Sequence, residues 1–549
     1  MTKHQNSSRR ISDSLSRRDV LRAGGLLLPA AAVTPALFTR VSRAATSSST
    51  FDYYISTSGN DSNSGSLSSP WAITGINTHQ STYAGKRLGI LPGTYDVSAL
   101  MAQSTNNGYQ EAILQINGGP NSSTRTYVGT SDSSGNYQRG TATLDAKGAS
   151  GIYGGSLNET SPAYVIGQTQ GSPYAPQPPN LGNWTLDGLN ITGFSRWAIT
   201  LADSGGVPTG IQNVTIQNCT LHDSVSIEGP ITTHPAPLMI YCSTNVLVSN
   251  CWFYNNKNIV ADKNHYAGIM IFAPGGGSAA VTNVTIEKCT LANSSNIYAG
   301  EDLGPVSNIT IRQCYIDMTL AGTNFAQPYA LQGFGRATAG LTASSFYNNI
   351  VKGGNFYDMS GTAPSSVGIK FYNNTWDRAG GAGYSSSDAG LFRFEETAGN
   401  THMFTAYNNL VYDNGAGSYG GYGMVACNTD GFALCDYNIY GATSGFYTYG
   451  ANGGGGTGSV SFASWKSAIG GDAHSSQNST NPFTNNGANA LQYQISPGSP
   501  AYQAGRVGGV ASGAVCNVGA WDGTVTQIGY SSSSSGAIAV PQPPVLSIT

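Results

Sequence analysis

Charged residues are scarce in this sequence. Of its 549 residues only 10% are Asp, Glu, Lys or Arg, and the formal net charge is −3. No stripe of basic residues follows the N-terminal segment, so we expect no nucleic-acid partner. The eight cysteines show no Cys-x-x-Cys or Cys/His spacing that would indicate a zinc site. The remainder includes 39% hydrophobic residues, 72 Gly and 31 Tyr. This composition is typical of an extracytoplasmic β-solenoid with a polar surface, not of a disordered chain.

Long apolar runs are absent as well. The weakly apolar run at 23–38 is interrupted by two prolines and is too short for a stable membrane span. It follows Ser16-Arg17-Arg18-Asp19-Val20-Leu21, which carries the paired arginines of a twin-arginine export signal. Small residues at Ser42 and Ala44 fit cleavage by signal peptidase. We therefore predict a signal peptide over 1–44 and a periplasmic or secreted mature protein without a membrane span.

Four short segments share one pattern, in which an Asn begins a β-branched run and a Cys ends it. The segments are 213–219, 245–251, 283–289 and 308–314. Their starts lie 25 to 38 residues apart (308−283 and 283−245), in the range typical of solenoid repeats. The alternating apolar, β-branched residues favour strand over helix. A strand that recurs once per coil predicts an all-β fold, a single-stranded parallel β-helix.

Four further copies of the repeat carry Asn in the Cys position. Adjacent coils of such a solenoid stack about 4.8 Å apart, so equivalent residues form a ladder. Asn suits the turn because it tolerates left-handed backbone and can hydrogen-bond to neighbouring coils through its amide. We predict one continuous structural turn ladder, with the thiols as small apolar filler. Its members are Cys219, Cys251, Cys289, Cys314, Asn349, Asn374, Asn409 and Asn438.

The rest of the chain divides by composition. We predict an N-terminal cap at 51–95, regular coils at 183–450, a closing segment at 491–522 and a low-complexity tail at 531–549. Caps are needed because both ends of a solenoid otherwise leave open strand edges. Pairing of Cys427 with Cys435 stays open.

Both ends of this region resemble one family. The opening Tyr53-Tyr-Ile-Ser-Thr-Ser-Gly-Asn-Asp-Ser-Asn-Ser-Gly, with Leu91-Pro-Gly-Thr-Tyr, and the ending Ser496-Pro-Gly-Ser-Pro-Ala, with Asn517-Val-Gly-Ala, are similar to the pectate-lyase-like right-handed parallel β-helix superfamily. The resemblance covers 51–522. It implies a right-handed helix with three strands per coil and a ligand groove along one stacked sheet and its loops. The superfamily includes polysaccharide lyases, glycoside hydrolases, esterases and non-catalytic adhesins, so the resemblance is specific for the fold and weak for chemistry.

The strand before each Asn-Val-Thr-Ile run is the expected groove face. The candidate strands are 237–241, 267–272, 296–300, 330–334 and 390–395. In a chain with so few charges, those that gather beside these strands are informative. The candidate site residues are Lys263, His265, Arg393 and Glu395 for catalysis, His234, Tyr241, Phe272 and Tyr298 for substrate binding, and Asp262, Glu301 and Asp302 as possible Ca²⁺ ligands.

Two chemistries fit these residues. Elimination on a uronate-containing polysaccharide needs a base, typically Lys or Arg in the superfamily, and a cation beside the carboxylate. Hydrolysis needs two carboxylates, such as Glu301 or Asp302 with Glu395 or Glu396. The paired-Asp signature expected of polygalacturonase-like hydrolases is absent, which favours a lyase. A non-catalytic glycan-binding or surface protein is the third alternative. In each case we expect a monomer with a polysaccharide partner.

Overall fold

The structure of the protein is a computed structural model. It describes residues 50–103, 111–147, 163–169, 178–194, 197–202, 210–224, 236–256, 267–273, 280–292, 296–299, 306–318, 329–333, 341–353, 355–359, 368–377, 390–394, 404–412, 422–426, 432–441, 445–448, 458–484 and 489–532. All of them belong to one compact unit, Ser48–Thr549. The predicted signal peptide lies outside the described residues and stays a prediction. Within the described part of the chain, no helix combines the length and the hydropathy needed to cross a membrane.

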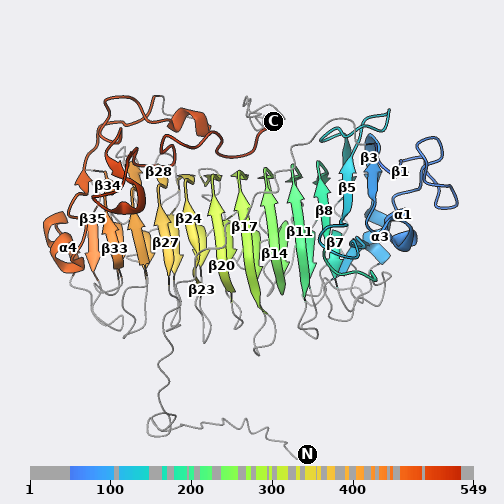
Figure 1. Cartoon of the computed structure of the whole chain (residues 1–549), viewed down its shortest axis with the longest axis horizontal. Helices are drawn as coiled ribbons and strands as arrows, with labels where there is room; N and C mark the ends of the chain where they lie inside the picture. The colour runs from blue at the N-terminus through green and yellow to red at the C-terminus, as the bar shows by residue number, and fades with distance from the viewer. Residues whose placement is uncertain are drawn as a thin grey trace, which may run out of the picture. The chain divides into compact units, whose positions relative to one another are not determined.

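Each coil contributes one strand to each of three sheets. Along the chain, a coil passes through sheet 1, sheet 2 and sheet 3 in turn, and Figure 1 shows the strands of sheet 2 stacked side by side from β8 to β33. Nearly all neighbours pair in parallel; β35 and β36 of sheet 1 pair antiparallel. This is the predicted all-β parallel β-helix.

The strands of sheet 1 are, in chain order, β4 (Glu111–Gln115), β7 (Ala163–Thr169), β10 (Trp197–Ala202), β13 (Leu238–Tyr241), β16 (Ala267–Phe272), β19 (Asn296–Ala299), β22 (Tyr329–Gly333), β26 (Asn355–Met359), β29 (Gly390–Phe394), β32 (Tyr422–Ala426), β35 (Gly445–Thr448) and β36 (Gly458–Val460). Those of sheet 2 are β1 (Tyr53–Ile55), β2 (Arg87–Ile90), β5 (Thr126–Thr130), β8 (Trp184–Asp187), β11 (Ile211–Gln217), β14 (Ser243–Ser249), β17 (Val281–Glu287), β20 (Val306–Arg312), β23 (Leu341–Thr342), β24 (Ser345–Tyr347), β27 (Ile369–Tyr372), β30 (Phe404–Tyr407) and β33 (Phe432–Asp436).

Sheet 3 has the shortest strands. They are β3 (Gly93–Asp96), β6 (Ala142–Asp145), β9 (Asn190–Thr192), β12 (Thr220–His222), β15 (Trp252–Tyr254), β18 (Thr290–Ala292), β21 (Tyr315–Asp317), β25 (Ile350–Lys352), β28 (Thr375–Asp377), β31 (Leu410–Tyr412), β34 (Ile439–Tyr440) and β37 (Ser476–Gln477). A small hairpin of β38 (Gly505–Arg506) and β39 (Val515–Cys516) stands apart. The helices are α1 (Gly75–Thr78), α2 (Gln80–Tyr83), α3 (Ser98–Gln103) and α4 (Phe462–Ile469), with 3₁₀ turns at Ala490–Tyr493 and Val507–Gly509.

The alternation within the repeat puts its apolar residues in the core. Val214 of β11 pairs in register with Val246 of β14, and Ile216 pairs with Val248. In β17 these two positions are Val284 and Ile286, and in β20 they are Ile309 and Ile311. These side chains are buried in one continuous cluster. Stacking of like residues across coils therefore builds a core that runs through all three sheets.

The turn between sheet 2 and sheet 3 carries the predicted ladder. Its four cysteines are fully buried, and burial raises the pKa of Cys219 and Cys289 well above the ordinary thiol value, so both remain protonated. The Asn349 amide donates to Asn374 Oδ1 at 3.1 Å, and the same bond links the next two pairs at 3.0 and 3.1 Å. The Cys314 backbone N–H joins the two halves by donating to Asn349 Oδ1 at 3.0 Å. The ladder is confirmed.

The left-handed residue of this turn is not the ladder residue itself, as the sequence suggested, but the one before it. Asn348, Asn373 and Asn408 have φ values of 55°, 52° and 54°. The ladder residue must point inward, so the preceding residue reverses the chain and its side chain points outward. Each Asn-Asn pair thus has one structural role inside and another outside.

Those outward asparagines hold the C-terminal segment. The Asn348 amide donates to Ala520 O at 2.8 Å, and the Asn408 amide donates to Arg506 O at 2.8 Å. Apolar residues of 483–528 cover the outer face of sheet 3 from β21 to β34 in a second buried cluster. Residues 491–522, which the sequence suggested as the closing segment, therefore lie along the coils.

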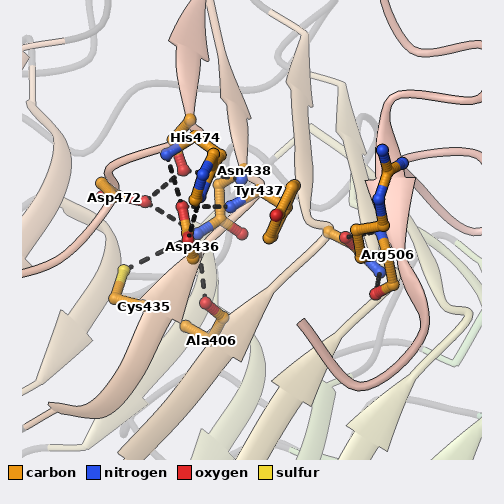
Figure 2. Close-up of polar contacts among 10 residues, drawn as sticks. Ala406, Cys435, Asp436, Tyr437, Asn438, Asp472, His474 and Arg506 are labelled. Atoms are coloured by element: carbon orange, nitrogen blue, oxygen red, sulfur yellow. Dashed lines mark hydrogen bonds and ion pairs between the residues drawn. The ribbon is translucent and has the colours of Figure 1, made fainter. Parts of the chain in front are cut away.

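The end of the helix is covered by α4 instead. Asp472 is fully buried, and its carboxylate accepts hydrogen bonds from Trp465 Nε1 at 2.8 Å, Tyr440 OH at 3.0 Å and the Asn438 amide at 3.1 Å. Figure 2 shows Asp472 beside the last ladder residue, Asn438. A buried carboxylate is tolerated where several donors surround it. This one ties the segment after α4 to the last coil.

Candidate functional site

The strands predicted as the groove face are neighbours in sheet 1. The order β13-β16-β19-β22-β26-β29 contains all five of them. It also contains β26, which the sequence reading did not single out. β26 precedes the copy of the repeat at 371–374 in the same way that the other groove strands precede theirs. The rule that found the other five strands would therefore have found it.

One register position runs along this face. It contains Thr200, Met239, Met270, Tyr298, Gln332, Asp358 and Arg393 on seven successive strands. In β13, the flanking residues Leu238 and Ile240 belong to the main core, whereas Met239 does not. Since side chains alternate along a strand, this position lies on the outer face of sheet 1.

The N-terminal part of this face is covered. Ala112, Tyr164, Ala202 and Met239 form a separate buried cluster against which Tyr241 packs. The Tyr164 hydroxyl donates to Met239 Sδ at 2.9 Å, and burial raises the pKa of Tyr164 well above its ordinary value. Tyr241, a predicted sugar-binding residue, is thus packed at the margin of a buried cluster. This cluster covers the outer face of sheet 1 as far as β13.

Along the strands after β13, the residue at the outer register position changes from apolar to polar or charged. From apolar Met239 and Met270 it passes to Tyr298, Gln332, Asp358 and Arg393. Asp358 and Arg393 are direct register partners on neighbouring strands, about 4.8 Å apart along the stack. An acidic and a basic residue at adjacent positions are notable in a chain with 10% charged residues.

Most of the predicted site residues are not among those that the structure describes. His234, Asp262, Lys263, His265, Glu301, Asp302, Glu395 and Glu396 are outside the described residues. Phe272, Tyr298 and Arg393 lie in described strands, so their partners on the neighbouring strands are known. Phe272 pairs with Tyr241 of β13, whereas Tyr298 and Arg393 share the outer position described above.

The proposed calcium ligands flank two adjacent strands. Asp262 comes shortly before β16, Glu301 and Asp302 follow β19, and β16 pairs with β19. Carboxylate oxygens are among the ligands that Ca²⁺ takes in proteins, but all three residues lie outside the described part of the chain, so the calcium site stays a prediction. The described residues themselves contain no cluster of three His, Cys, Asp or Glu side chains suited to a metal.

Comparisons with known proteins agree with this architecture. Residues 180–376 match the family described as the right handed beta helix region. Together with the three parallel sheets, this match shows that the chain has the right-handed parallel β-helix fold predicted from its sequence. No curated protein matches the sequence.

Several solved structures are similar. They include pectate lyase Pel9A, with 13% identity over 86% of this chain and 96% of that one at a TM-score of 0.48. A rhamnogalacturonan lyase has 16% identity over 67% and 83% of the two chains, with a TM-score of 0.44. PfbA, a surface adhesin of Streptococcus pneumoniae, has 10% identity over 69% and 84%, with a TM-score of 0.35. These likenesses are too distant to bear on the chemistry.

Proposed function

We propose that this protein is an exported enzyme that cleaves a uronate-containing polysaccharide by β-elimination. The groove is the outer face of sheet 1 from β16 to β29, with the loops beside it. The observation that carries the proposal is the polar run Gln332, Asp358 and Arg393 at one outer position of this sheet. This run begins at β22, beyond the buried Met239 and Met270 of the same outer position, and we infer that the substrate lies along it.

Elimination needs few groups, and this chain has candidates for each. A base removes the proton from the carbon next to the uronate carboxylate, and the C–H electron pair forms the new C=C bond. The bond from the β-carbon to the glycosidic oxygen breaks, and that oxygen takes up a proton from the protonated base or from water. Arg393 or Lys263 serves as the base, with His265 assisting. A positive charge must also stabilise the carboxylate as negative charge builds up on it. Asp262, Glu301 and Asp302 would hold Ca²⁺ for this purpose beside Lys263, whereas a reaction centred on Arg393 of β29 would need a different positive charge, because three strand spacings separate β29 from β19.

The spacing of strands supports elimination over hydrolysis. Glu301 and Asp302 adjoin β19 and Glu395 adjoins β29, with β22 and β26 between these strands. Three strand spacings amount to about 14 Å. Paired carboxylates in hydrolases stand about 5–9.5 Å apart. The hydrolytic alternative therefore needs loops that bring these carboxylates closer than their strands. A non-catalytic glycan-binding protein needs no such pair and is distinguished by experiment.

The test is a screen of the mature protein on acidic and neutral polysaccharides, with products analysed by mass and ultraviolet absorbance. We expect oligosaccharides with unsaturated ends from a uronate polymer and none from neutral polymers. Products that gain the mass of water would mean hydrolysis. Binding without cleavage across the whole panel would mean a non-catalytic protein.

Export is a separate part of the proposal and rests on the arginine pair. Replacing Arg17 and Arg18 with Lys is expected to leave the precursor in the cytoplasm, because the twin-arginine pathway reads this pair. Fractionation of cells followed by immunoblotting measures the result. Unchanged export of the double variant would show that another pathway recognises the leader.

A further inference from the structure

The C-terminal segment crosses several coils. We call residues 505–531 the strap. It runs back along the turns between sheet 2 and sheet 3, toward the middle of the stack, as Figure 1 shows in orange to red. Its hydrogen bonds reach the coils of β30, β27, β24, β20, β17 and β14. These coils are successive in the stack, and five spacings between them amount to about 24 Å.

Two outward asparagines hold the strap by its backbone. The Asn408 amide donates to Arg506 O at 2.8 Å, and Asn408 Oδ1 accepts from the Arg506 backbone N–H at 3.2 Å. Asn250, at the same turn position of the β14 coil, pairs with Ser531 in the same two ways, at 3.1 and 2.7 Å. Each side-chain amide therefore bonds to the strap as the backbone of a neighbouring strand would.

The strap makes two separate sets of contacts. Residues 505–522 bond to the coils of β24, β27 and β30. Residues 527–531, which we call the strap end, bond to the coils of β14, β17 and β20. Between the two sets, Gly523, Thr524 and Thr526 are exposed. Since local opening follows such breaks in packing, the strap end can be released while 505–522 stay bound.

The strap end fits closely against its coils. The Gly529 backbone N–H donates to Gln313 O at 2.8 Å. The Tyr530 backbone N–H donates to Thr290 Oγ1 at 2.8 Å. Gly529 has φ of 79° less 2°, that is 77°, and a Cβ there would lie 2.7 Å from Thr290 Oγ1 and 3.0 Å from Tyr315 Cβ. Glycine is therefore required here for its backbone conformation and for the close approach.

Ser531 also reaches a loop that belongs to an earlier coil. Its carbonyl oxygen accepts a hydrogen bond from Arg139 Nη1, and the Arg139 guanidinium lies 4.1 Å from the centre of the Tyr530 ring. Arg139 belongs to the segment between β5 and β6, and neither strand pairs with the coils of β14, β17 or β20. The strap end thus joins parts of the helix that sheet pairing does not connect directly.

The strap end differs from the other contacts between coils in this respect. Coils of a solenoid contact only their neighbours, so each can open once an adjacent coil has opened. The coils of β14, β17 and β20 carry β13, β16 and β19, three of the strands predicted as the groove face. We propose that the strap end is a brace that keeps these three coils closed, and that its release loosens them. The brace acts whether or not sheet 1 binds or cleaves a polysaccharide.

The test is hydrogen exchange measured by mass spectrometry on the whole protein. Gly529→Ala is expected to dislodge the strap end without changing any coil residue. The amides of 243–254 and 281–292 should then exchange about tenfold faster, the effect of losing one or two hydrogen bonds. The amides of 87–90, at the N-terminal end of the stack, should exchange as in the unaltered protein.

Gly498→Ala is the matched control. Gly498 also lies in the C-terminal segment and has φ of 79°, but a Cβ there would meet nothing within 4 Å. This variant carries the same backbone strain without displacing the strap end, so exchange in 243–254 and 281–292 should not change. Equal exchange in the two variants would contradict the brace.

Deletion of 527–549 removes the strap end outright, and deletion of 533–549 is its control. The first deletion should accelerate exchange in 243–254 and 281–292, and the second should not. Unchanged exchange after the first deletion would overturn the proposal. Equal acceleration at 87–90 would also overturn it, because the loss would then be a general one. Neither result depends on the protein cleaving any polymer.

Discussion

At least one of the variants Arg393→Ala and Lys263→Ala is expected to lose elimination activity by about 10²–10⁴-fold, the usual contribution of a positioned base. Both should fold as the parent does, since neither residue is predicted in the core. The measurement is the rate of unsaturated-product formation from the uronate polymer that the unaltered protein cleaves best, with thermal unfolding as the check on folding.

The two variants also locate the reaction along the groove. Loss with Lys263→Ala alone would put the centre near β16 and β19, and loss with Arg393→Ala alone would put it near β26 and β29. Lys370→Ala is the control, because Lys370 is an exposed residue of β27 on sheet 2. Full activity in both groove variants would rule out these residues as the base and with them the proposed mechanism.

The fold was predictable because each coil repeats the same arrangement of a strand and a turn. A β-branched run ending in Cys or Asn requires a buried strand followed by a tight turn, and this requirement recurs in register across eight copies. The outward role of the first Asn in each pair was not predictable from the repeat, because its partners lie in the C-terminal segment. Asn348, for example, donates to Ala520, which is far away in the sequence.

Helix α4, near the C-terminal end of the coils, did have local sequence signals at both of its ends. Ser461 caps α4 by accepting a bond from the Ser464 backbone N–H, and Gly470 ends the helix with φ of 61°. Serine before a helix and glycine after it are its usual boundaries. These signals stand in a Gly- and Ser-rich stretch between the predicted coils (183–450) and the predicted closing segment (491–522), for which the sequence analysis predicted no element.

The candidate site was less predictable than the fold, for a physical reason. Catalytic groups need to be present once, so no repeat marks them, and the loops that carry them differ in length between coils. The strand register identifies Asp358 as the neighbour of Arg393. The sequence analysis predicted Arg393 as a site residue but not Asp358.

The largest expected loss of stability comes from the Asn ladder. Asn374→Ala is expected to lower the free energy of unfolding by about 3–5 kcal/mol, because it leaves several buried polar groups without partners. The Asn374 amide donates to Phe346 O at 2.9 Å and to Asn409 Oδ1 at 3.0 Å. Its Oδ1 accepts from the Asn349 amide at 3.1 Å. Urea unfolding followed by circular dichroism measures the change.

Cys289→Ala is the matched control, because Cys289 occupies the same ladder position three coils earlier and is equally buried. Its thiol makes weak contacts to backbone oxygens, at 3.3 Å to Glu287 O and 3.8 Å to Val248 O, and to the neighbouring thiols of Cys251 and Cys314. Its removal is expected to cost about 1–2 kcal/mol, mainly through a small cavity. If the two variants unfold at the same urea concentration, the amides contribute no more than packing. A larger loss at Asn374 would instead show that linked amide hydrogen bonds hold the C-terminal coils together, where the N-terminal coils depend on apolar thiols.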